Sequence, residues 1–198
     1  MPEYSFPPAL QIYGAAIQFI VEGGFGGSGL RASRLLADEG VGKLDDSGMI
    51  RIDKTTWYPA GGILRAYRRI ETDLGANVLY RAGLSIPLHA ILPAGIRSPE
   101  GALRSLNLAY YLNHGLNGEP VLDAVKGTFR HNIGEYRARS DGEQRVVVEC
   151  ECPYPCELDR GIVEGLAKRF EPRATVAHAA SAPCRKRGAK LCSYSVAW

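Results

Sequence analysis

Apolar and polar residues follow one another in the last quarter of the chain in a pattern that changes from strand to helix and back to strand. Val146, Val148 and Cys150 recur at every second position, which places them on one face of a strand. From Asp159 onwards the apolar residues recur at helical spacing, and Asp159 is the expected N-cap of this helix. Two further strands follow, and the last one alternates up to Trp198.

Helical periodicity also marks three segments in the first half of the chain. Residues 63–74 form an apolar stripe opposite a polar face, and residues 78–91 continue the helical pattern until Pro87 breaks or kinks it. A third helix is expected after Ser98, because a capping residue, a proline and an acid follow in the order found at helix N-termini. The apolar segment 10–21 fits either a strand or a helix.

An Asp141–Gly142 turn joins a segment over 126–139 to the valine-rich strand, as in a long antiparallel hairpin. Helices in the middle of the chain and hairpins near its end predict an α/β protein, α+β in detail. In this fold class a helical layer packs on one face of a mostly antiparallel sheet. Such a pair of layers leaves room for an apolar pocket between them.

Composition narrows the class of protein. The chain has 198 residues, 45% of them hydrophobic, which suffices for a sizeable core, and its net charge of +3 does not indicate nucleic-acid binding. Five cysteines cannot all pair within one chain, so a reducing, cytoplasmic location is the simpler expectation. The sequence has neither the long apolar run of a membrane span nor a convincing signal peptide.

The cysteines are the sharpest chemical feature. Cys184 and Cys192 bracket a turn, and Cys156 follows the end of the valine-rich strand, so the three thiols are expected to meet at one end of the sheet. Three thiolates supply most of a tetrahedral zinc site, whereas buried free cysteines also serve as small apolar residues. The candidates for the fourth ligand are Cys152, Glu157 and His178, or the fourth position is left open.

The order of helices and hairpins, with Cys156 followed by the CRKRGAKLC segment and a final alternating strand, resembles the 4-vinyl-reductase-like domain of bacteria. The resemblance covers residues 58–198 and implies a TRAPP-like fold related to haem/nitric-oxide-binding domains, preceded by an extension over 1–57 that packs on the core. In phenol-sensing regulators of that family, a cysteine after a strand and a later Cys-x7-Cys pair hold a structural zinc. The acidic residue often found three positions before the pair is Ser181 here.

Histidines in the helical layer raise the question of haem. His89 and His114 both lie there, and in a haem-binding relative one histidine would be the axial ligand. We do not expect haem, because a single histidine beside an apolar helix is more often a hydrogen-bonded structural residue. His131 is in phase with Phe129, and it either lines a pocket or packs in the core.

These features predict a non-enzymatic small-molecule-binding or sensory module that acts as a homodimer. The resemblance implies an apolar, aromatic or lipid-like ligand, and the pocket residues to inspect are Tyr67, Tyr110, Phe129, His131 and Tyr136. One alternative is a structural scaffold of the TRAPP type. The other is an enzyme in which Cys156 is a nucleophile with a histidine as its base.

Four basic residues surround the turn near the C-terminus: Arg185, Lys186, Arg187 and Lys190. We expect them at the exposed tip of a hairpin. They form either a solvated turn or a docking site for an anionic partner.

Overall fold

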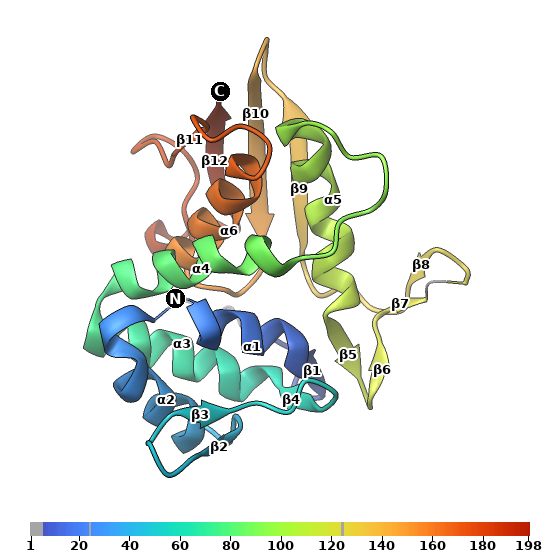
Figure 1. The fold of residues 1–198 in the computed structure, drawn as a ribbon. Coiled ribbons are helices and arrows are strands. Elements are labelled where there is room, and N and C mark those ends of the chain that lie inside the picture. Colours follow the sequence, from blue (N-terminus) through green and yellow to red (C-terminus); the bar gives the residue numbers. More distant parts are fainter. Residues whose placement is uncertain (1–5, 24, 124) are drawn as a thin grey trace.

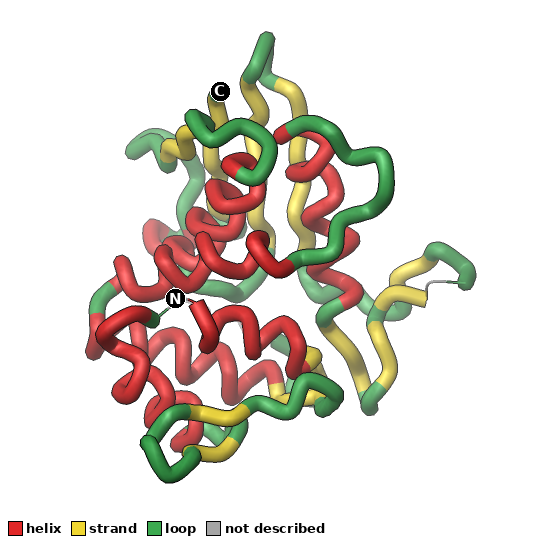
Figure 2. Tube along the Cα trace, in the orientation of Figure 1, coloured by secondary structure: helices red, strands yellow, loops and turns green. Residues whose placement is uncertain are grey.

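The computed structural model describes residues 6–23, 25–123 and 125–198, and it confirms the α+β class. Helices α5 and α6 pack on one face of an antiparallel sheet, and α1 to α3 form a second group beside α4 (Figures 1 and 2). The six α-helices of the described residues are α1 (Gly14–Gly23), α2 (Gly29–Asp38), α3 (Ala60–Leu74), α4 (Ala76–His89), α5 (Pro99–Leu112) and α6 (Cys156–Lys168).

The larger sheet near the C-terminus has the strand order β11-β12-β10-β9, with antiparallel neighbours throughout. Its strands are β9 (Glu135–Ser140), β10 (Arg145–Glu151), β11 (Thr175–Ala177) and β12 (Cys192–Ala197). The predicted alternation is confirmed, since Val146, Val148 and Cys150 are buried. The predicted Asp141–Gly142 turn joins β9 to β10, although its first strand begins later than expected.

A smaller sheet ties the beginning of the chain to its middle. Strand β1 (Leu10–Tyr13) pairs with both β4 (Trp57–Pro59) and β5 (His114–Leu116), and β5 pairs with β6 (Glu119–Pro120). The segment that fitted a strand or a helix is therefore both, because β1 runs directly into α1. The division of the chain near residue 57 stays a prediction.

Short elements complete the described chain. Two-stranded ladders are formed by β2 (Lys43–Leu44) with β3 (Ile50–Arg51) and by β7 (Leu122–Asp123) with β8 (Thr128–Phe129). Two 3-10 turns, η1 and η2, span Gly26–Ser28 and Arg185–Arg187. None of the described helices has both the length and the apolar character that a bilayer span requires.

Helix boundaries mostly follow the sequence pattern, with one informative error. Ser98 caps α5 by accepting a hydrogen bond from the Gly101 N–H, as predicted. Helix α6 instead begins at Cys156 behind Pro155, so the assignment of Asp159 as N-cap is wrong. Asp159 lies inside the first turn and is fully buried, because its carboxylate pairs with a cation from a distant part of the chain.

Glycines permit an unusually close approach of α4 and α6. A Cβ placed on Gly161 would lie 2.2 Å from the Tyr80 carbonyl oxygen and 2.9 Å from the Gly83 Cα. A Cβ on Gly83 would in turn lie 2.3 Å from the Leu158 carbonyl oxygen. Only glycine fits at such contacts, because neither backbone can move aside without disturbing the helix pair.

We predict that Gly161→Ala destabilises the fold by about 1–3 kcal/mol, because overpacking outweighs the higher helix propensity of alanine. Urea denaturation measures the change in free energy of unfolding. The matched control is Gly27→Ala, at a position with open space around it, where we expect a change within about 0.5 kcal/mol. Equal effects of the two substitutions would contradict the close packing of α4 on α6.

Candidate functional site

Two adjoining cavities lie among the helices. The outer cavity has a volume of about 470 Å³ and is bounded by α1, α4, α5, α6 and the segment 90–93. The inner cavity, of about 100 Å³, lies deeper, against β1, α3 and β9. Six residues line both cavities: Ala16, Ile86, Leu106, Ala109, Asn113 and Ile162. The shared wall makes the two cavities parts of one apolar region between helices and sheet.

A buried histidine closes the inner cavity. The His114 Nδ1 lies 2.6 Å from the Tyr110 carbonyl oxygen, and its Nε2 lies 2.7 Å from the Tyr154 hydroxyl. Burial lowers the pKa of His114 to about 4, so its imidazole is neutral at pH 7. A carbonyl can only accept, so Nδ1 carries the proton and Nε2 accepts from Tyr154. Both ring nitrogens of His114 are therefore occupied.

A buried ion pair connects the sheet, α6 and η2. Arg185 donates to the carboxylate of Asp159 and to the carbonyl oxygens of Cys150 and Tyr154. Tyr136 donates to the same carboxylate at 2.6 Å. Burial raises the pKa of Asp159 to about 6, and the guanidinium of Arg185 opposes that rise. The carboxylate is thus mainly ionised at pH 7, as the pair with Arg185 requires.

The three cysteines singled out in the sequence lie together. The Cys156 sulfur is 3.1 Å from that of Cys192 and 3.9 Å from that of Cys184, and all three side chains are buried. A hydrogen bond from the Cys156 thiol lowers the pKa of Cys192 to about 5, with help from the Arg185 side chain and its backbone N–H. The same coupling raises the pKa of the Cys156 thiol. The cluster therefore favours one thiolate next to a protonated neighbour.

The candidate fourth ligands of this cluster have other partners. Cys152 donates to the Asp159 carboxylate, Glu157 pairs with Arg160, and His178 contacts the Pro183 carbonyl oxygen. Within the described ranges, the group of side chains whose ligand atoms lie within 4.8 Å of one another contains the three thiols alone. Metal binding at Cys156, Cys184 and Cys192 stays a prediction.

The aromatic residues predicted for a pocket separate into two sets. Tyr67, Tyr110 and Tyr136 line the inner cavity. Phe129 is half exposed and stacks on Tyr111, and His131 is exposed, so neither is part of that wall. The predicted long strand would have placed both side chains beside the sheet, but Phe129 lies in β8, which pairs with β7, and β9 begins only at Glu135.

Exposure of the four basic residues is confirmed for Lys186, Arg187 and Lys190 and is wrong for Arg185, and each of the four side chains has a partner within the chain. Arg185 is buried against Asp159, and Lys186 pairs with Glu71. Arg187 donates to the Ala182 carbonyl oxygen, and Lys190 pairs with Glu151 at 3.3 Å. The segment forms the 3-10 turn η2 instead of the tip of a hairpin.

A cysteine nucleophile needs an adjacent base. Across the described residues, no hydrogen bond joins a histidine to Cys156, and the nearest polar partners of its thiol are the other two cysteines. The arrangement suits metal binding or structural packing better than nucleophilic attack.

Sequence reasoning missed two contributors to the cavities. Tyr154 lies between two prolines, outside any periodic segment, so no pattern pointed to its contact with His114. The sequence placed His89 in the helical layer as a possible axial ligand, but not in a pocket. It lines the outer cavity, and its ring stacks on Phe19 with centroids 5.1 Å apart. The helical spacing of the apolar residues around residue 89 is the signal that could have placed it.

Comparison with protein-family models and with curated proteins finds no match for this sequence. Solved structures do share its fold. An H-NOX protein from S. oneidensis in the Fe(II)NO ligation state is 12% identical with a TM-score of 0.63, covering 93% of this chain and 98% of that one. A K. algicida H-NOX mutant is 10% identical with a TM-score of 0.58 and coverages of 94% and 96%. At these identities the likeness establishes the fold.

The comparisons correct the expected family. The structural neighbours are H-NOX domains, so the resemblance to the 4-vinyl-reductase-like domain is wrong. The wider grouping of haem/nitric-oxide-binding domains that it named overlaps with this result. Element order and the three cysteines did not identify the family, because several α+β domains share the same succession of helices and hairpins.

The expectation against haem is also overturned. The similar structures include proteins studied for haem redox potential and haem distortion, so the fold is one that houses haem. The sequence offered isolated histidines as the sign of haem, whereas the structure adds an apolar cavity that His89 lines. His114 has no free nitrogen for iron, whereas no hydrogen bond engages the His89 imidazole within the described residues.

We predict that the His114 imidazole stays neutral down to about pH 4. Its folded pKa is below the unfolded value of about 6.5, so its contribution to stability is complete above pH 6.5 and is lost as the pH falls towards 4. The full loss is on the order of 3 kcal/mol. Site-specific NMR titration of the imidazole measures this pKa, with N-acetylhistidine amide as reference.

The site-specific measurement is needed because Asp159 changes the stability of the fold with pH in the opposite direction to His114. Its raised folded pKa makes the fold gain stability as the pH falls through the same range, which masks His114 in bulk unfolding data. Protonation of His114 near pH 6.5 would contradict the burial and the hydrogen bonds described here.

Proposed function

We propose that the chain is a non-enzymatic small-molecule-binding sensory module that holds an apolar ligand in the outer cavity. The single observation that carries this proposal is the outer cavity itself. Its volume of about 470 Å³ falls in the range of about 300–1,000 Å³ that is usual for small-molecule sites. The H-NOX fold of the structural neighbours supports the same class of function.

The wall of the cavity indicates the ligand's chemistry. Most of the lining residues are alanine, leucine and isoleucine, and the polar groups come from Tyr13, Ser105, Asn113 and His89. The Asn113 side-chain amide already donates to the Ala109 carbonyl oxygen. The wall therefore offers few hydrogen-bond partners, so a strongly polar ligand would lose its hydration without replacement, whereas a mainly apolar ligand would not.

Haem is a second candidate occupant, supported by His89. Imidazole nitrogen is a common axial ligand of haem iron, and His89 faces the outer cavity beside Phe19. A bound haem iron would supply a site for a diatomic gas, such as the nitric oxide named for the S. oneidensis neighbour. The residues of this chain would contribute the imidazole and the apolar enclosure of the macrocycle.

We predict that filling the cavity abolishes ligand binding. Ala109→Trp places an indole at the shared wall of the two cavities and should weaken binding of the apolar dye Nile red at least tenfold, because the dye and the indole compete for the same space. Fluorescence titration measures the affinity. Ala179→Trp, at an exposed position, is the matched control and should bind as the unmodified chain does.

Hemin titration separates the two candidates. A Soret band that shifts on hemin binding, is lost in His89→Ala and is kept in His131→Ala would identify haem as the occupant. Nile red binding without a hemin response would identify an apolar organic ligand. Failure of both probes to bind, or binding unchanged by Ala109→Trp, would contradict the proposed site.

We also propose that Cys156, Cys184 and Cys192 hold a structural zinc. The donor set fits, because buried thiolates are preferred zinc ligands and the three sulfurs already lie within 4.8 Å of one another. Arg185 supplies positive charge beside Cys192, which favours its thiolate. Zinc would join the start of α6 to η2 and to the first residue of β12.

We predict near-stoichiometric zinc in the purified protein, lost in Cys184→Ser and kept in Cys150→Ser. Cys150 is equally buried but lies outside the cluster, so it is a matched control. Structural zinc contributes on the order of 10 kcal/mol in small domains, whereas this chain also has a large core, so chelation should loosen the C-terminal sheet and leave α1 to α3 folded.

Elemental analysis and hydrogen exchange measure these two effects. Metal-free protein with undiminished stability would show that the cysteines are packing residues.

Two alternatives involve contacts with other proteins instead of a bound ligand: a TRAPP-type scaffold and a homodimer. An interface is supported by exposed apolar side chains near the end of α4 and along α5. These side chains belong to Leu88, Ile91, Leu108 and Leu112. Ile91, Leu108 and Leu112 also line the outer cavity, so an interface there would be compatible with the sensory role.

A further inference from the structure

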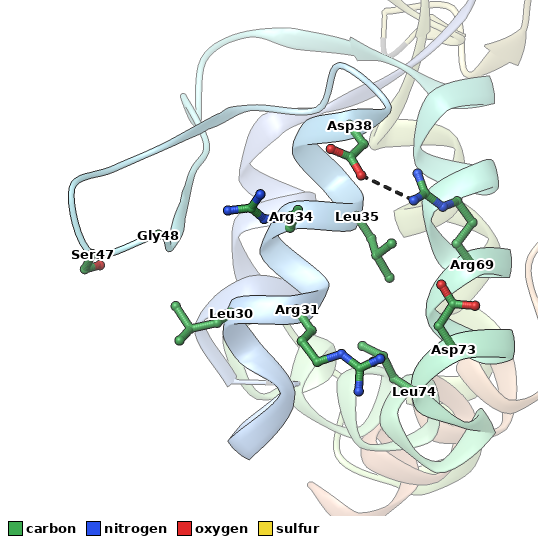
Figure 3. Close-up of a pocket in the computed structure, with 10 residues that line it drawn as sticks. All are labelled: Leu30, Arg31, Arg34, Leu35, Asp38, Ser47, Gly48, Arg69, Asp73 and Leu74. Carbon is green, nitrogen blue, oxygen red and sulfur yellow. Dashed lines mark hydrogen bonds and ion pairs between the residues drawn. The ribbon is translucent and has the colours of Figure 1, made fainter.

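A groove separate from the two cavities lies between α2, α3 and the turn that joins β2 to β3. Its volume is about 470 Å³, and it is lined by charged and apolar residues together (Figure 3). Arg34 and Arg31 project from α2, and Leu30 lies on the same helix. No part of the proposed sensory site or of the cysteine cluster borders this groove.

Two of the three guanidiniums in the groove have no carboxylate partner among the described residues. Arg31 and Arg34 are exposed and lie one turn apart on α2, and neither has an ion pair or hydrogen bond within the described residues. Arg69, on the opposite wall, behaves differently, because it pairs with Asp38 at 3.2 Å and with Glu39 at 3.3 Å. The groove thus keeps two cations available while its third is neutralised by its own neighbours.

The other residues that line the groove limit the kind of anion that Arg31 and Arg34 could bind. Leu30 is 57% exposed and offers an apolar surface beside the guanidiniums. The groove is lined by three arginines and by two aspartates, Asp38 and Asp73, so its net charge of +1 matches a singly charged anion better than a multiply charged one such as phosphate. A single carboxylate attached to an apolar group satisfies both conditions, since the carboxylate pairs with a guanidinium and the apolar group covers Leu30.

The turn that forms one wall is held in place by its own hydrogen bonds. The Asp45 carboxylate accepts from the N–H groups of Ser47 and Met49 at 2.9 and 3.0 Å, and from the Arg51 side chain at 2.7 Å. Gly48, at φ +80°, faces Leu30 across the groove. A wall that is already ordered loses little conformational entropy when a ligand binds.

We propose that this groove is a binding site for an amphipathic monocarboxylate. The shared chemistry is one carboxylate on an apolar body, which either a free organic acid or an acidic side chain in an apolar peptide can present. The site is independent of the proposed sensory function, because its residues do not overlap with those of the cavities.

Hexanoate is the probe, followed by NMR of the arginine Nε–H signals and by calorimetry. We expect millimolar binding that weakens at least tenfold in the double variant Arg31→Gln/Arg34→Gln, because both carboxylate partners are removed. Arg145→Gln is the matched control, at an exposed arginine outside the groove, and should bind as the unmodified chain does. Leu30→Asn keeps both cations and should weaken hexanoate but not acetate.

Two further experiments exclude binding in the outer cavity and distinguish a free acid from an acidic peptide. Repeating the titration in Ala109→Trp removes any contribution from the outer cavity, so this test stands whether or not the proposed function holds. Binding of an acetylated Leu–Glu–Leu amide at least tenfold tighter than hexanoate would assign the site to an acidic peptide, and the reverse order would assign it to a free acid. Equal binding of hexanol, tighter binding of inorganic phosphate, or hexanoate affinity unchanged in the double variant would overturn the proposal.

Discussion

The buried ion pair between Asp159 and Arg185 is the interaction on which the C-terminal half of the fold depends. Removing either partner would leave the other charge buried and unpaired, which typically costs about 3–5 kcal/mol. The Arg185 guanidinium also donates to the carbonyl oxygens of Cys150 and Tyr154, so η2 is fixed against both β10 and the start of α6. That attachment brings Cys184 and Cys192 beside Cys156.

The same pair reaches the wall of the inner cavity. Asp159 accepts from Tyr136, whose ring lines that cavity. Tyr154 accepts from Arg185 through its carbonyl and donates to His114 through its hydroxyl. A ligand that displaced either tyrosine would therefore disturb the support of the cysteine cluster. These contacts physically connect the wall of the inner cavity to the cysteine cluster.

Local periodicity predicted α3, α5 and the alternation of β10, because an element with one buried face has apolar residues at a regular spacing in its own sequence. It also brought the right three cysteines together, although through an expected hairpin where the structure has a 3-10 turn. The pairing of Asp159 with Arg185 lay beyond such reasoning, since the two residues are 26 positions apart and neither carries a local signal. The H-NOX fold was likewise out of reach, because neighbours at 10–13% identity share packing and not residues.

The helices enclose an apolar cavity that is open to a ligand. A crystal structure determined under xenon pressure tests it most directly, because xenon enters apolar cavities that exclude water. We expect a xenon atom in the outer cavity, in contact with Ala16, Ile86 and Leu106. A cavity closed by its own side chains, or filled with ordered water instead of xenon, would contradict it.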